Sequence, residues 1–168
     1  AQPAWPERSV RLIVPFGAGG AVDTLSRTVA NAFPAQANGQ TLVVENRPGA
    51  GGTIAGAATA QARPDGATLM MADLGANAIG KALQPGLPYD PLTAFTPICH
   101  LVTLPLVLVV PAAVPAASAA EFFAYAKAQG DLPYAHPGIG YIGHLAQELM
   151  IRRAGLRMTP IPYRSGAE

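Results

Sequence analysis

Residues 14–23 read VPFGAGGAVD, and this stretch decides the fold class. The valine- and isoleucine-rich residues 8–14 predict a strand, and the apolar spacing over 22–33 predicts a helix. Three glycines therefore stand at a strand-to-helix turn. Glycine at such a turn lets a backbone or an anion come close, because it has no side chain to obstruct the approach.

The composition is that of a globular protein with a core of ordinary size. The chain has 168 residues, of which 50% are hydrophobic and 12% charged, and its formal net charge is +1. This balance offers neither a basic stripe for nucleic acid nor a polybasic membrane patch. The single cysteine, Cys99, excludes an internal disulfide and a multi-cysteine metal site.

Two segments bear on localisation. The chain opens AQPAWPERS, which resembles a mature end left after removal of a signal peptide and predicts an exported protein. Residues 101–120 carry no charge and are numerous enough to span a bilayer, but three prolines interrupt them. We therefore predict two buried strands, 98–104 and 106–110, followed by a linker.

Strands and helices are expected to alternate along the chain. Further strands are expected at 41–45, 68–71, 132–135 and 159–161, and further helices at 53–62, 118–130 and 141–154. This order predicts an α/β fold with a largely parallel sheet.

A Gly-rich turn recurs along this order. GAGG stands at 17–20 and again at 49–52, and HPGIG stands at 136–140, each time between a strand and a helix. A helix N-terminus offers unpaired N–H groups and a partial positive charge, and parallel strands gather such turns at one edge. Tight packing would explain any one turn, but three together favour an anion site.

Nucleotide motifs do not fit these turns. A P-loop ends in Gly-Lys-Ser/Thr, whereas Gly20 is followed by Ala21, and a dinucleotide fingerprint needs Gly or Ala where Val22 and Ile54 stand. A small carboxylate held by backbone N–H groups fits better. A Rossmann-like enzyme that uses the turns for a phosphate cofactor remains the alternative.

Other chemistry finds little support. Asp23 either completes the first helical turn or faces the ligand. His144 and Glu148 share a helix face, but HLAQE is not HExxH and a third ligand is missing, so no metal is expected. No GxSxG elbow occurs, and neither catalysis nor a cofactor is predicted.

Several segments together resemble one family. RLIVPFGAGGAVDTLSR, VVENRPGAGGTIA, LPYAHPGIGYIGHLAQEL and IPYRSGA resemble the tripartite tricarboxylate transporter substrate-binding proteins, the Bug receptors, in order along the whole chain. The resemblance implies a periplasmic-binding-protein (Venus-flytrap, type II-like) fold that closes over a small carboxylate or related solute. Residues 1–104 would form the first lobe and 105–168 part of the second, because the family's chains are longer.

The resemblance also implies the residues of a ligand cleft. The first lobe would contribute Phe16, Ala18, Gly19, Gly20, Asp23, Ala72, Ala76 and Asn77, and the second lobe Gly138, Ile139, Gly140, Tyr141, His144 and Tyr163. Family members usually carry small hydroxyl residues around the second-lobe loop, where this chain has His136-Pro137 and Tyr141. The added ring is expected to shrink or redirect the pocket.

The implied partners are the solute and the membrane subunits of a transporter, and no nucleic acid. A sensor that reports ligand to a membrane kinase is a further alternative. A short second lobe would leave a strand edge uncovered, so the chain is expected either to associate with another copy or to be a fragment of a longer one.

Overall fold

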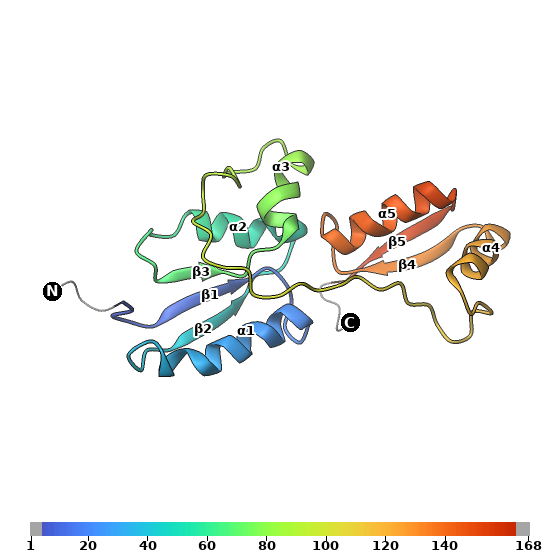
Figure 1. Cartoon of the computed structure of the whole chain (residues 1–168). Coiled ribbons are helices and arrows are strands. Elements are labelled where there is room, and N and C mark those ends of the chain that lie inside the picture. Colours follow the sequence, from blue (N-terminus) through green and yellow to red (C-terminus); the bar gives the residue numbers. More distant parts are fainter. Residues whose placement is uncertain (1–4, 164–168) are drawn as a thin grey trace.

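The computed structural model describes residues 5–163, which form two separate parallel sheets (Figure 1). In the larger sheet β1 (Val10–Val14) lies between β2 (Leu42–Asn46) and β3 (Thr68–Met70). The smaller sheet pairs β4 (Leu132–His136) with β5 (Met158–Pro162). Every strand pair in the described residues is parallel. The predicted α/β class with parallel sheets is therefore confirmed.

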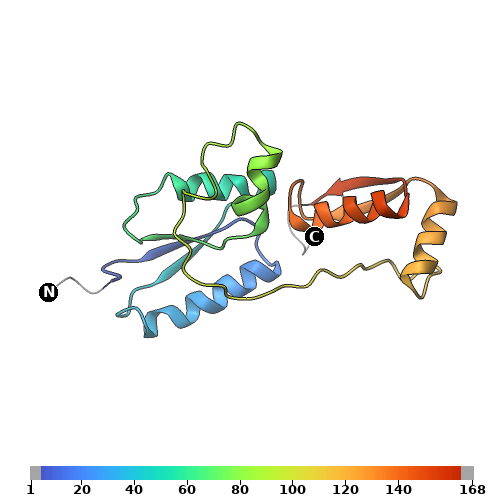
Figure 2. The same ribbon diagram turned by 45° about the horizontal axis from the view of Figure 1, so that its top comes forward.

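Helices follow the strands as the sequence predicts. They are α1 (Ala21–Ala32), η1 (Phe33–Ala35), η2 (Ala50–Gly52), α2 (Thr53–Ala60), the π-helical η3 (Gly75–Ile79), α3 (Gly80–Leu83), α4 (Ala119–Gln129) and α5 (Ile142–Ala154). In the N-terminal part (residues 10–97), α1 covers one face of the sheet and α2 the other (Figures 1 and 2). Each of these helices starts at the carboxyl end of a strand, where the Gly-rich turns lie.

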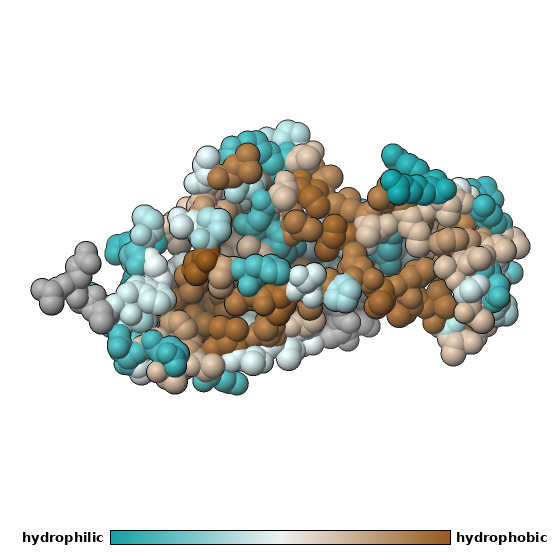
Figure 3. All heavy atoms as spheres, viewed as in Figure 1, coloured by the Kyte–Doolittle hydropathy of each residue, from teal (hydrophilic) through white to brown (hydrophobic). Residues whose placement is uncertain are grey.

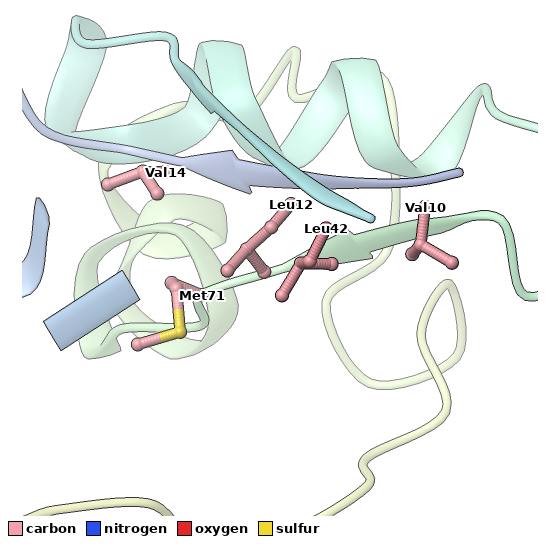
Figure 4. Close-up of a cluster of buried hydrophobic side chains, with 5 residues drawn as sticks. All are labelled: Val10, Leu12, Val14, Leu42 and Met71. Atoms are coloured by element: carbon pink, nitrogen blue, oxygen red, sulfur yellow. The ribbon is translucent and has the colours of Figure 1, made fainter. Parts of the chain in front are cut away.

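The core of the N-terminal part lies beneath β1. Val10, Leu12 and Val14 alternate along the strand and point to the same side as Leu42 and Met71 (Figure 4). The apolar face of α1 packs against them through Val22, Leu25 and Val29, as its spacing predicts. Ile13 is fully buried on the opposite face, so β1 has the two buried faces of a central parallel strand.

The C-terminal part (residues 119–162) has a separate core. Phe122 and Ala126 of α4 pack with Tyr134 of β4, Ile151 of α5 and Leu156. Residues 84–97 belong to the N-terminal part, where the buried Tyr89 donates to the carbonyl oxygen of Ala76. Residues 98–118 link the two parts, and the end of this link, including Val110 and Val114, packs against the second core.

The two strands predicted at 98–104 and 106–110 are wrong. The apolar segment, residues 98–110, is extended but irregular, and its residues 98–109 are all exposed. Val107 is 79% exposed and Val109 80% exposed, and Figure 3 shows hydrophobic side chains at the surface between the two parts. A buried strand needs a neighbour to pair with its N–H and C=O groups, and no strand of residues 5–163 runs beside this one.

Pro105 within this segment, and Pro97 and Pro111 on either side of it, also lack the N–H group that a sheet requires. No helix in residues 5–163 is long and apolar enough to cross a membrane.

Candidate functional site

The Gly-rich turns meet where the two parts of the chain face each other. A Cβ atom on Gly51 would lie only 3.0 Å from the carbonyl oxygen of Ile139, and one on Gly75 would lie 3.4 Å from that of Gly140. The carboxyl end of β4 points at the carboxyl edge of the larger sheet (Figure 1). The structure therefore brings residues 49–52, 75–76 and 138–141 together from distant parts of the sequence.

The turn between β1 and α1 is held by Asp23. Its Oδ2 atom accepts the N–H of Gly19 at 2.9 Å and the Nε–H of Arg27 at 3.0 Å, and its Oδ1 atom accepts from Asn46 at 2.8 Å. The hydrogen bond from Arg27 is the main cause that lowers the pKa of Asp23 to about 2. Asp23 is 2% exposed, so its carboxylate faces the turn and shapes it.

The same turn leaves space at the start of α1. Gly20 precedes the helix without a side-chain cap, and a Cβ atom there would meet nothing closer than the Gly17 oxygen at 3.9 Å. Gly19 has a φ of 85°, a left-handed conformation that favours glycine. Ala18 and Gly19 are exposed, whereas Phe16 is partly buried. An anion can therefore approach the first turn of α1.

The loop after β3 centres on Asp73, which sequence reasoning missed. Its carboxylate accepts the N–H groups of Gly75 and Ala76, each at 3.2 Å, and burial raises its pKa. The predicted Asn77 turns its Oδ1 back to the N–H of Asp73, and Ala76 is fully buried. Ala72 is exposed. An acidic residue three positions after the end of β3 was the available signal.

Tyr141 crosses from the C-terminal part to the N-terminal part. Its hydroxyl donates to the carbonyl oxygen of Pro15, and its ring stacks on Phe16 with centroids 4.5 Å apart and planes 26° apart. Tyr141 is 2% exposed. Burial, helped by the charge of Asp73, raises the pKa of its phenol to about 12, so the hydroxyl remains a donor at neutral pH.

Two histidines lie behind the loop from 137 to 141. The N–H of Gly138 donates to Nδ1 of His136 at 3.2 Å, and the N–H of Gly140 donates to Nδ1 of His144 at 3.4 Å. Ile139 and Tyr163, by contrast, are 67% and 41% exposed. The backbone N–H of Tyr163 donates to the carbonyl of His136, which places this residue beside the same loop.

A cavity of about 190 Å³ lies between the two parts. Its walls come from the second Gly-rich turn, from residues 75–84 and from the loop 138–141. Of the predicted site residues, only Ile139 and Gly140 line it. Thr53 and Gln84 supply polar atoms that sequence reasoning did not foresee. The stacked rings of Tyr141 and Phe16 occupy the space at the end of β1. No cluster of three potential metal ligands occurs within residues 5–163.

Known proteins are similar to this chain in sequence and in fold. The family profile described as "Tripartite tricarboxylate transporter family receptor" matches residues 25–168. BugT of Bordetella pertussis is 36% identical over 162 residues, which cover 95% of this chain and 49% of BugT. An R. palustris protein solved with adipate superposes with a TM-score of 0.90 at 35% identity, over 97% of this chain and 55% of that one.

The periplasmic binding protein BugD gives a TM-score of 0.82 at 33% identity, over 97% of this chain and 54% of BugD. These matches confirm the periplasmic-binding-protein fold that the sequence resemblance implied. The chain spans about half the length of the relatives it matches.

Proposed function

Because the chain belongs to the tripartite tricarboxylate transporter receptor family, we propose that the protein captures a small carboxylate, or a related solute, in the periplasm. It would hand this solute to the membrane subunits of a transporter. The observation that carries the proposal is the meeting of Gly-rich turns from both parts of the chain around one cleft. The family's members are receptors, and the proposal gives this protein no catalytic step.

The two parts would act as the two lobes of the receptor. The expected boundary at 104/105 lies within the linking residues 98–118, before Val110 begins to pack against the second core. The loop 138–141 already contacts the N-terminal part in this structure, so the lobes would open to admit a solute and close again over it. Association with a second copy of the chain would cover the exposed apolar segment, and light scattering tests this part of the proposal.

The first turn of α1 would receive one carboxylate. The N–H of Gly19 already donates to Asp23, so the anion would meet the amides that follow, at Gly20 and in the first turn of the helix. The partial positive charge of the helix N-terminus favours an anion there. Asp23 would then fix the shape of the turn without contacting the solute.

The second part of the chain would contribute a donor and an apolar wall. The phenol of Tyr141 donates to Pro15 in this structure, and a solute carboxylate that enters the cleft would compete for that donor. The exposed side chain of Ile139 and the ring of Phe16 would contact the carbon chain of the solute. Because Tyr141 fills space at the end of β1, the proposal favours a short solute.

A thermal-shift screen tests the proposal. Adipate, malate and shorter mono- and dicarboxylates are compared with ATP and NAD, and the diamide of adipic acid serves as an uncharged control of matched shape. A ligand at a hundred times its Kd stabilises a folded protein by about 2.7 kcal/mol, so one carboxylate should raise the Tm by several degrees. Stabilisation by a nucleotide, with flat responses to all carboxylates, would refute the receptor assignment and favour a cofactor enzyme.

A further inference from the structure

His136 and His144 form a contacting pair directly behind the loop 137–141. His136 ends β4 and is 3% exposed, and His144 lies in the first turns of α5. Their ring centroids are 4.4 Å apart, with an angle of 41° between the planes. Each ring accepts one glycine N–H of the loop at its Nδ1 atom. The pair is therefore linked to both ends of the segment Gly138–Gly140.

These hydrogen bonds fix the protonation state of both rings. A backbone N–H can only donate, so the Nδ1 atom that receives it carries no proton. Each imidazole must then be neutral, with its proton on Nε2. The Nε2 atom of His136 is buried and has no hydrogen-bond partner in the described structure, so a charged His136 ring would gain nothing there. Burial correspondingly lowers the pKa of His136.

Protonation of the two histidine rings would turn each Nδ1 atom from a hydrogen-bond acceptor into a donor. An imidazolium carries a proton on both nitrogens, and its Nδ1–H would then face the N–H of a glycine. Both loop hydrogen bonds would be lost, and two adjacent cations would repel each other. We propose that His136 and His144 are positioning residues that hold the loop 137–141 in its solute-receiving conformation only while both rings are neutral, so that solute affinity falls in acid.

Two other titratable groups face the pair in the described structure. Glu148 on α5 lies with Oε1 3.9 Å from Nε2 of His144, and it accepts a hydrogen bond from Tyr134 of β4. The ring of Tyr134 lies 5.9 Å from that of His136. The charge of Glu148 opposes the effect of burial on the pKa of His136, but its side chain is 47% exposed, so water and salt screen that charge.

The proposal rests on the receptor function proposed above, and it predicts the sign of a pH profile. Calorimetric affinity for the carboxylate found in the screen should fall about tenfold as the pH drops from 7.5 to well below the ordinary histidine value of about 6.5, as expected for two lost hydrogen bonds. If attraction between imidazolium and solute anion governed binding instead, affinity would rise in acid. A rise or a flat profile overturns the proposal.

Asparagine variants separate positioning from packing. In His136→Asn and His144→Asn the Oδ1 atom can accept the same glycine N–H but does not titrate. The double variant should keep most of the affinity at pH 7.5 and lose the pH dependence. His100→Asn, at an exposed histidine in the apolar segment, should leave the profile of the parent unchanged. A double variant that retains the parent's pH profile contradicts the proposal.

Nitrogen NMR of the parent protein measures the protonation state of both histidine rings without any solute. At neutral pH both rings should show an unprotonated Nδ1, and the amide signals of Gly138 and Gly140 should move together with the histidine titrations. A proton on either Nδ1 at neutral pH refutes the positioning role. This measurement stands if the asparagine variants fail to fold or if no carboxylate binds, so the two proposals can fail separately.

Discussion

Replacing Asp23 with alanine should destabilise the protein through the turn it holds. Three donors converge on this carboxylate, from Gly19, Arg27 and Asn46, at 2.8–3.0 Å. The side chain of Arg27 is 52% exposed and can turn to water. The other two donors lie in partly buried hydrogen bonds, and each would lose a charged acceptor.

The size of the effect follows from these two donors. A buried polar group left without its partner costs about 1–3 kcal/mol, so Asp23→Ala should lower the free energy of unfolding by about 3 kcal/mol. That is a large share of the roughly 5–15 kcal/mol typical of native proteins. Asp23→Asn keeps one acceptor oxygen and should lose less, about 1–2 kcal/mol. Urea denaturation followed by circular dichroism measures both values.

A matched control comes from an exposed ion pair. Arg8 lies 2.7 Å from Asp65, and their side chains are 65% and 40% exposed. Such pairs contribute below about 1 kcal/mol, so Arg8→Ala should change little. If Asp23→Ala cost no more than Arg8→Ala, the claim that Asp23 builds the turn would be refuted.

Three further predictions concern the cleft and its acid stability. Gly20→Val should fold, because the nearest atom to a Cβ there is the Gly17 oxygen at 3.9 Å, yet lose carboxylate affinity in calorimetry. Gly86→Ala, where a Cβ atom meets nothing within 4 Å, should retain that affinity. Tyr141→Phe removes the donor to Pro15 and should lower stability in urea by about 1 kcal/mol. The pKa of Asp23 is about 2 against an ordinary 3.8, so its contribution is present above pH 4 and lost as pH falls towards 2. Urea midpoints in this range should therefore fall less in Asp23→Ala than in the parent.

The helices and most strands could be predicted from the sequence because local residue patterns determine them. The alternation of Val10, Leu12 and Val14 and the helical spacing from Val22 both describe buried faces that the structure contains. The prediction of strands in the apolar segment was wrong because a strand-like composition indicates only a surface that can pack against a neighbouring strand. A run such as LVLVV at 106–110 cannot reveal whether that neighbour is present.

The sequence allowed only the general position of the cleft to be predicted. The three Gly-rich turns marked the edge where the two parts meet, because parallel strands place such turns together. The contact of Tyr141 with Pro15 joins residues 126 positions apart, and no local pattern encodes such a distance. The orientation of Asp23 into its own turn depends on Asn46 from the next strand, which a helix-start pattern does not include.

The stretch LVLVV at 106–110, exposed as far as Val109, also has the composition of a fibril-forming strand, with β-branched residues and no charge. Pro105 and Pro111 stand immediately on either side of it. Since proline has no N–H to offer a stacked copy, a cross-β ladder growing through this stretch would be interrupted at both ends. About six or seven residues are needed for a dry zipper between such sheets, and the two prolines leave five. The two prolines therefore stand as gatekeepers against aggregation beside Val107 and Val109, which are 79% and 80% exposed.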